Sequence, residues 1–204
     1  MSEWFGPLDS EHRVPPRQQT RVAAFLISAH GALARQFAFT LPIKFESAWQ
    51  TELNAQIYRE AEIISLLLRA TSWVPDLSLA YMAASWETAW FPAPVEGIPD
   101  RTLAAAAGLA TLSHAVHAGI RPAALLPVQA NANDPFVTAL RRVEFESGRL
   151  LQAQSQFLKG PGLLPFRGAV SATLERRHAE IGRLWAQALQ GVGIAIPARN
   201  SGKP

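Results

Sequence analysis

The chain has 204 residues, of which 49% are apolar and 17% are charged, against roughly 25% charged residues in typical soluble domains. This composition suits one globular domain with a sizeable apolar core and excludes disordered, collagen-like and coiled-coil chains. The 19 basic and 16 acidic residues leave a net charge of +3, which by itself does not indicate a nucleic-acid partner. Because the chain has no cysteine, disulfides, thiolate nucleophiles and cysteine-ligated metals are excluded.

No segment has the composition of a membrane span or a signal peptide. The first twenty residues contain no apolar run, so we expect no signal peptide. The most apolar stretches, Val22–Ile43 and Leu103–Val128, contain histidine and arginine and are interrupted by Pro42 and Pro122. Neither offers the 18 or more consecutive apolar residues typical of a transmembrane helix. We therefore expect a cytoplasmic protein.

Prolines and capping residues divide the first half of the chain. Residues 1–17 contain three prolines and are expected to form an extended arm. A first helix is predicted over 18–40, before Pro42, and a second over 45–72, before Pro75. The second helix is predicted to bury one apolar stripe, formed by Trp49, Leu53, Ile57, Ile64 and Leu68. A third helix is expected from Asp76 to Trp90, followed by a proline-rich loop.

Two aspartates predict the helix starts in the second half. Asp100 is the expected N-cap of a helix that ends near Gly119, and Asp134-Pro135 predicts the start of another. The sequence Lys159–Gly162 ends that helix, and a last helix is expected over 168–190 before a flexible tail at 197–204. No segment alternates with a period of two. The fold class is therefore predicted to be all-α: a single-domain bundle over 18–196, with five long helices and one or two short ones.

Histidines are the most informative candidates for chemistry. His30 falls on the apolar stripe of the first helix, and His114 and His117 share a face of a helix that is apolar almost all round. Glu175 and His178 have the Glu-x-x-His spacing of di-iron carboxylate bundles, although the motif occurs once rather than twice.

These spacings predict a metal or haem site in the bundle core. Its candidate ligands are His114, His117, Glu175 and His178, with Glu144 or Glu60 as a further ligand. The alternative is that the buried histidines bond only to backbone carbonyls or to serines such as Ser113, or that His178 is half-exposed and pairs with Glu175. The sequence leaves both interpretations open.

Arginine clusters give a second candidate surface. Sixteen of the 19 basic residues are arginine, and several form clusters that could contact a phosphate backbone if the fold places them on one surface. The candidate nucleic-acid residues are Arg13, Arg17, Arg21, Arg176, Arg177 and Arg183. Because acidic residues are interleaved with these clusters, a solvated, salt-bridged surface is the alternative.

Aromatic residues give the third candidate surface. The chain has six tryptophans, and tryptophan is enriched at the energetic centres of protein interfaces. The predicted partner-binding residues are Trp4, Phe5, Trp73, Trp86, Trp90 and Phe91. The alternative is that these rings close one end of the bundle.

The shortage of charge favours a role in protein contact. Leu103–Leu112 has no charged residue, so its helix must be enclosed. With that helix central, apolar parts of Val22–Phe39 and Ser72–Phe91 are expected to stay exposed, which is typical of interaction sites. We therefore expect a non-catalytic accessory or adaptor protein, or an assembly subunit, that self-associates or binds a partner. The alternatives are a metal- or haem-binding enzyme or carrier, and a nucleic-acid-binding subunit.

Overall fold

The computed structural model describes residues 16–40, 47–70, 93–119 and 134–191, and within these ranges it is an all-α bundle without strands. Its elements are α1 (Pro16–Thr40), α2 (Ser47–Ala70), α4 (Arg101–Gly119), α5 (Pro135–Leu158), the 3₁₀ helix η2 (Pro161–Phe166) and α6 (Arg167–Gly191). The predicted fold class is thereby confirmed. The predicted helix from Asp76 to Trp90 lies outside the described residues, as do the tail and all but the last two residues of the arm.

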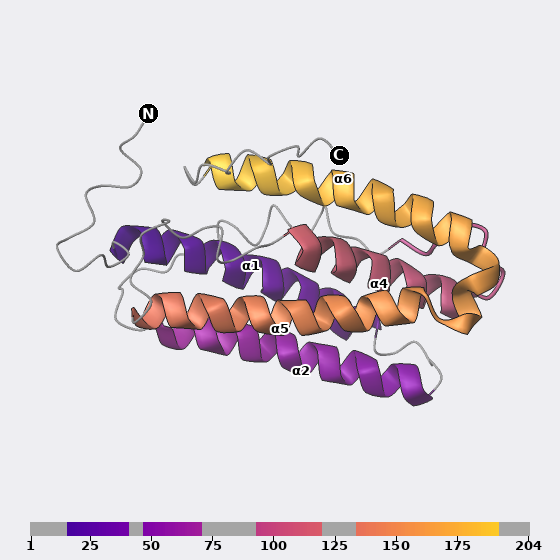
Figure 1. The fold of residues 1–204 in the computed structure, drawn as a ribbon, viewed down its shortest axis with the longest axis horizontal. Coiled ribbons are helices and arrows are strands. Elements are labelled where there is room, and N and C mark those ends of the chain that lie inside the picture. Colours follow the sequence, from indigo (N-terminus) through magenta and orange to yellow (C-terminus); the bar gives the residue numbers. More distant parts are fainter. Residues whose placement is uncertain (1–15, 41–46, 71–92, 120–133, 192–204) are drawn as a thin grey trace, which may run out of the picture.

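The helices pack side by side along the long axis of the molecule. α6 lies along one side of the bundle and α2 along the opposite side, with α1, α4 and α5 between them (Figure 1). α4 packs against α5 and α6, whereas α2 packs against α1 and α5. None of the described helices combines the length and hydropathy that a bilayer crossing requires.

Both predicted aspartate caps are confirmed. Asp134 Oδ1 accepts a hydrogen bond from the backbone N–H of Phe136 at 2.8 Å, and Pro135 occupies the first helical position. Asp100 Oδ1 accepts from the backbone N–H groups of Thr102 and Leu103, at 2.8 and 3.2 Å. These bonds satisfy donors that the first helical turn otherwise leaves without partners.

α4 is enclosed by the bundle, as its lack of charge predicts. Residues 106–113 are all buried, and the run of alanine and glycine at 104–108 lets neighbouring backbones approach closely. Gly108 packs directly against the backbone of Ala93, and Val95 N–H donates to Ala104 O at 3.0 Å. A side chain larger than hydrogen does not fit at Gly108.

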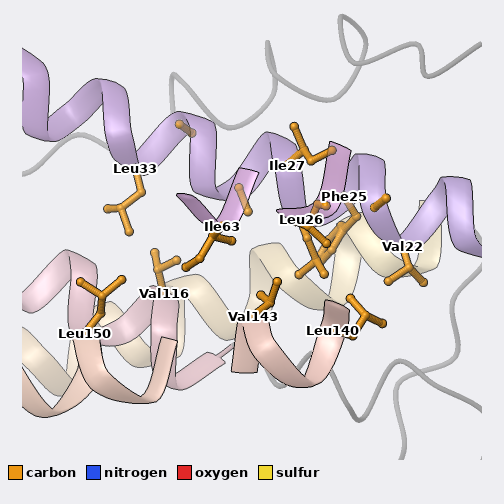
Figure 2. Packing of buried hydrophobic residues seen from close by; sticks show 14 of the residues in the cluster. Val22, Phe25, Leu26, Ile27, Leu33, Ile63, Val116, Leu140, Val143 and Leu150 are labelled. Carbon is orange, nitrogen blue, oxygen red and sulfur yellow. The ribbon is translucent and has the colours of Figure 1, made fainter. Parts of the chain in front are cut away.

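The expected exposure of the first apolar helix is wrong over the described residues. Val22, Phe25, Leu26, Leu33 and Phe37 of α1 are each at most 1% exposed (several are labelled in Figure 2). The bundle thus encloses two apolar helices, because the formal charges gather on α2, α5 and α6. The other stretch expected to be exposed, Ser72–Phe91, lies outside the described residues.

The buried face of α2 is also rotated from the predicted one. Leu68 is exposed, and Ile57 and Ile64 are only partly buried. The side chains that α2 buries follow the spacing of three and four residues, at Leu53, Gln56, Glu60, Ile63 and Leu67. This register places an amide and a carboxylate inside the bundle.

Candidate metal centre

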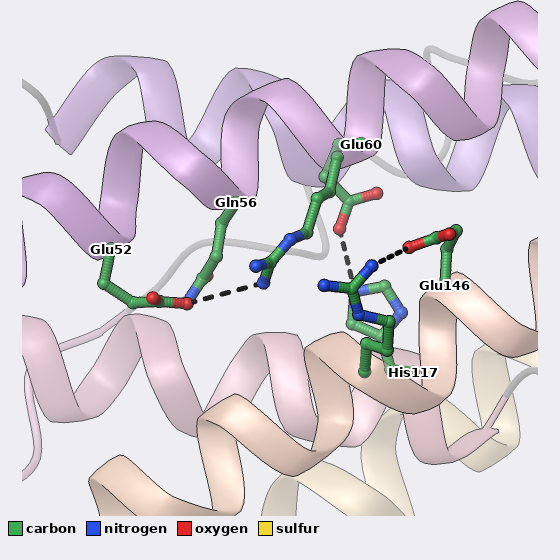
Figure 3. A network of polar contacts seen from close by, with 7 residues as sticks. Glu52, Gln56, Glu60, His117 and Glu146 are labelled. Carbon is green, nitrogen blue, oxygen red and sulfur yellow. Dashed lines mark hydrogen bonds and ion pairs between the residues drawn. The ribbon is translucent and has the colours of Figure 1, made fainter.

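Three ionisable side chains from three helices meet in the interior. His30 of α1 and His117 of α4 lie on either side of Glu60 of α2, and none of the three side chains has exposed surface. His30 Nδ1 lies 2.7 Å from Glu60 Oε2, and His117 Nε2 lies 2.8 Å from Glu60 Oε1. The two imidazole centroids are 5.7 Å apart. Each carboxylate oxygen therefore has its own imidazole (the bond to His117 is drawn in Figure 3).

The local sequence explains how these residues come together. His30 follows the continuously buried segment 22–29 of α1. Glu60 occupies a core position of α2, between Gln56 one turn before it and Ile63 one turn after it. His117 lies in the last turn of α4, the helix that the bundle encloses. All three side chains are placed on rigid helices rather than on loops.

The two imidazoles keep Glu60 ionised despite its burial. Burial favours the neutral acid and by itself raises the carboxyl pKa. The charges of His117 and His30, together with their hydrogen bonds, outweigh burial and lower the pKa of Glu60 from its usual 4.5 to about 2. A carboxylate is thus held in the core by imidazoles, a type of side chain that also binds metal ions.

Other buried polar atoms lie on the same helices. Gln56 Oε1 and Ser113 Oγ have no hydrogen-bond partner among the described residues, and neither do His30 Nε2 and His117 Nδ1. Gln56 is one turn from Glu60 on α2, and Ser113 is one turn from His117 on α4. An unpartnered buried polar atom costs about 1–3 kcal/mol. The interior thus holds several groups able to bond to an additional polar ligand.

The neighbouring acids are neutralised differently. Glu146 of α5 pairs with Arg142 at 2.7 Å and Arg149 at 3.3 Å, both on its own helix. Glu52 of α2 lies 3.8 Å from Arg59 and accepts from Gln56 Nε2 at 3.3 Å (Figure 3). Glu60, in contrast, has imidazoles from two other helices as the partners of its oxygens.

The His30–Glu60–His117 cluster has the donors that a transition-metal ion requires. One atom from each residue can be chosen so that all three lie within 4.8 Å of one another. Bonds of about 2.1 Å to imidazole and carboxylate place tetrahedral ligand atoms about 3.4 Å apart, so the two hydrogen-bonded pairs, at 2.7 and 2.8 Å, have to open by about 0.6 Å and the widest separation has to close by up to about 1.4 Å. Because a carboxylate lies directly between the imidazoles, the cluster suits a bare ion rather than a haem. The site fits an ion with two nitrogen ligands and one oxygen ligand.

The structure divides the ligand set predicted from sequence. His117 joins His30 and Glu60, whereas His114 turns to α5 and α6 and meets His178. Glu175 is exposed on α6, and Glu144 is partly buried on α5. Of the two further ligands considered, Glu60 is the one in the cluster. The spacing of apolar residues in the first helix predicts that His30 is buried, but nothing in the sequence identifies Glu60 as its partner.

The second imidazole pair forms a chain of hydrogen bonds. His114 Nδ1 lies 3.1 Å from His178 Nε2, and His114 Nε2 lies 3.1 Å from Ser155 Oγ. Ser155 Oγ donates to Leu151 O at 2.8 Å. Burial first, and then the charges of His178, His117 and Lys159, lower the pKa of His114 from its usual 6.5 to about 4. His114 is thus a neutral imidazole at pH 7.

The other predicted surfaces are only partly described. Arg176 and Arg183 are exposed on α6, whereas Arg177 is buried and pairs with Glu180 at 2.9 Å. Arg17 and Arg21 belong to α1, but their side chains are not described. The remaining candidates lie outside the described residues: Arg13, Trp4, Phe5, Trp73, Trp86, Trp90 and Phe91. Their predicted roles stay predictions.

Comparison of the chain with known protein families, curated proteins and solved structures finds no match.

Proposed function

We propose that this protein is a helical-bundle metalloprotein that binds one divalent transition-metal ion between His30, Glu60 and His117. The observation that carries the proposal is an ionised carboxylate, enclosed in the core, between two imidazoles from two other helices. Of the three functions expected from the sequence, this is the one that the contacts of the described residues support best.

Charge gives the physical reason for an ion. The Glu60 carboxylate is a negative charge in a mainly apolar interior, where a charge is costly unless a positive charge lies beside it. A divalent cation can take the place of the protons on the two imidazoles: it compensates the carboxylate and accepts the lone pairs that the imidazole nitrogens then offer. The ligands come from α1, α2 and α4, so the ion would also join three helices of the bundle.

The donor set indicates which ions fit. Two imidazoles and one carboxylate are the protein ligands of many catalytic zinc sites and of non-haem iron(II) sites. Such a set leaves coordination positions open, and an ion there supplies Lewis-acid chemistry or lowers the pKa of a bound water. Gln56 and Ser113, one turn from two of the ligands, have buried oxygens that can accept or donate further hydrogen bonds in the same interior.

The proposal is tested with the full chain after removal of metal by a chelator. We expect added Co²⁺ to give the visible absorption of a protein-bound ion and to raise the melting temperature, because the ion binds only the folded state. In Glu60→Gln and in His30→Gln, the amount of tightly bound Co²⁺ should fall by one ion per chain. Elemental analysis after dialysis measures that amount.

The matched control is Glu62→Gln, which removes a carboxylate two residues away on the same helix. It should bind Co²⁺ as the unchanged chain does. Circular dichroism establishes that each variant is folded. Unchanged Co²⁺ binding in folded Glu60→Gln and His30→Gln, or no binding by the unchanged chain, would overturn the proposal.

A further inference from the structure

The pair formed by His114 and His178 lies apart from the cluster around Glu60 and belongs to different helices. His114 points from α4 toward Ser155 of α5 and His178 of α6, whereas His117 reaches Glu60 of α2. The two rings meet edge to face, with centroids 5.2 Å apart, and both residues are partly exposed. Solvent and small ions can therefore reach this pair more readily than the buried cluster.

The hydrogen bonds determine which ring nitrogens of this pair carry protons. Ser155 has one hydroxyl proton, and it is donated to Leu151 O. Ser155 Oγ must then accept from His114 Nε2–H. A neutral imidazole has one N–H group, so His114 Nδ1 is an acceptor and His178 Nε2 donates to it. The chain of donors runs from α6 through α4 to α5.

This arrangement is that of a metal ligand with its supporting partner. A ligating imidazole presents one nitrogen lone pair to the ion and donates its other N–H to a fixed acceptor, which sets the tautomer and the ring orientation. His114 presents the Nδ1 lone pair and is fixed through Nε2–H by Ser155.

We propose that His114 Nδ1 and His178 Nε2 form a second metal site, which binds a divalent ion of the Cu²⁺, Ni²⁺ or Zn²⁺ class and joins α4 to α6. The two nitrogens are 3.1 Å apart, close to the about 3.3 Å between tetrahedral ligands with bonds of about 2.05 Å. Binding requires His178 as a neutral imidazole without a proton on Nε2, because the ion takes the Nε2 lone pair. Imidazole ligands favour these ions, and Cu²⁺ is bound most tightly among them.

The test uses Cu²⁺ as the probe and Glu60→Gln as the background, because that substitution removes a ligand of the first site. We expect the Glu60→Gln chain to bind one Cu²⁺ whose electron paramagnetic resonance spectrum shows coupling to two imidazole nitrogens. Adding His178→Gln should weaken the binding at least about tenfold and reduce the coupling to one nitrogen or none. Ser171→Ala, an exposed change two turns away on α6, should leave both readouts unchanged.

A second variant tests the supporting partner. Ser155→Ala keeps both imidazoles but removes the acceptor of His114 Nε2–H, so the Cu²⁺ affinity should fall about tenfold while the two-nitrogen signal is retained. If Glu60→Gln does not fold, the same substitutions are compared in the unchanged chain, where His178→Gln should lower the number of bound Cu²⁺ ions by one.

If neither His178→Gln nor Ser155→Ala changes the Cu²⁺ affinity or the spectrum, the proposal of a second site is overturned. That result leaves the first site untouched, because its own test depends on Glu60 and His30. Conversely, loss of Co²⁺ binding at Glu60 without any change in the two-nitrogen Cu²⁺ signal separates the two proposals.

Discussion

Glu60 makes the folded protein sensitive to acid. Its pKa is about 2 in the folded chain and 4.5 when unperturbed, so the unfolded state takes up the proton first as the pH falls. The stability that the ionised carboxylate contributes is complete above pH 4.5 and is lost as the pH falls toward 2. The difference between the two pKa values corresponds to about 3 kcal/mol in the free energy of unfolding. We expect urea unfolding of metal-free protein to show this loss between pH 5 and 2.5 and Glu60→Gln to show much less of it.

The Glu60 prediction has a matched control in Glu62→Gln, which should keep the pH dependence of the unchanged chain. At pH 7, Glu60→Gln should be less stable by on the order of 3 kcal/mol, since two buried imidazoles lose their charged partner. Equal acid sensitivity in Glu60→Gln and the unchanged chain would contradict the assignment of an ionised Glu60.

The lowered pKa of His114 predicts a second pH dependence of the stability, at higher pH than that of Glu60. Its folded pKa of about 4 lies below the usual 6.5, so protonation favours the unfolded chain as the pH falls through this interval. Because the ring is partly exposed, solvent screening reduces the effect to about 1–2 kcal/mol. In metal-free protein, the ring proton resonances of His114 should titrate near pH 4, as measured by nuclear magnetic resonance. A midpoint near 6.5 would show that the ring is not held neutral.

At the scale of elements, the ends of helices could be predicted because they depend on local chemistry. Asp100 and Asp134 cap the first turns next to them, and each requires only residues two or three positions away. The rotation of a helix depends on its neighbours instead. α2 has apolar residues on two faces, and counting them favours Ile57, Ile64 and Leu68 over the face that contains Glu60. The burial of Glu60 depends on its bonds to two imidazoles, which lie 30 and 57 residues away in the sequence.

The division of the predicted ligand set has a similar cause. Residues three apart on a helix point about 60° away from each other around its axis. On a surface helix, both face the same neighbour, which is why His114 and His117 are expected to share a site. α4 is enclosed, so a turn of 60° is enough to bring His114 to α5 and α6 and His117 to α2. The spacing identified the residues but could not assign their partners.

Gly108 is the position at which the packing of α4 is most sensitive to substitution. A Cβ there would overlap the backbone carbonyl of Ala93, so either the loop or the helix must move. Gly108→Ala should therefore lower the stability by about 1–3 kcal/mol, even though alanine favours helix by about 1 kcal/mol. Thermal unfolding measures the change.

Gly148→Ala in α5 is the matched control for Gly108. A Cβ at Gly148 meets no atom within 4 Å, so the helix preference of alanine acts alone and should raise the stability by about 0.5–1 kcal/mol. The two substitutions are chemically identical and should have opposite signs. A stabilising Gly108→Ala would mean that the loop does not pack on α4 as described.

At the scale of the whole molecule, the distribution of charge explains how so few charged residues suffice. α1 and α4 are mostly buried, while α2, α5 and α6 carry most of the charged residues of the described helices, and most of these are at least partly exposed. The described part of the chain therefore does not require a partner to cover α1, which removes one of the reasons for expecting an assembly subunit. The predicted aromatic docking residues remain the other reason.

Self-association should therefore depend on those aromatic residues and not on the described surface. The exposed large apolar residues described are Tyr58, Leu68, Phe145 and Leu164, and the ring of Phe145 is partly covered by Arg142, 5.3 Å from its centroid. They are spread over three elements, and single exposed apolar residues are ordinary on monomers. By light scattering, we expect an oligomer that Trp90→Ser with Phe91→Ser converts to monomer and that Tyr58→Lys leaves intact. A monomeric unchanged chain would contradict self-association, and dissociation by Tyr58→Lys would place the contact on α2 instead.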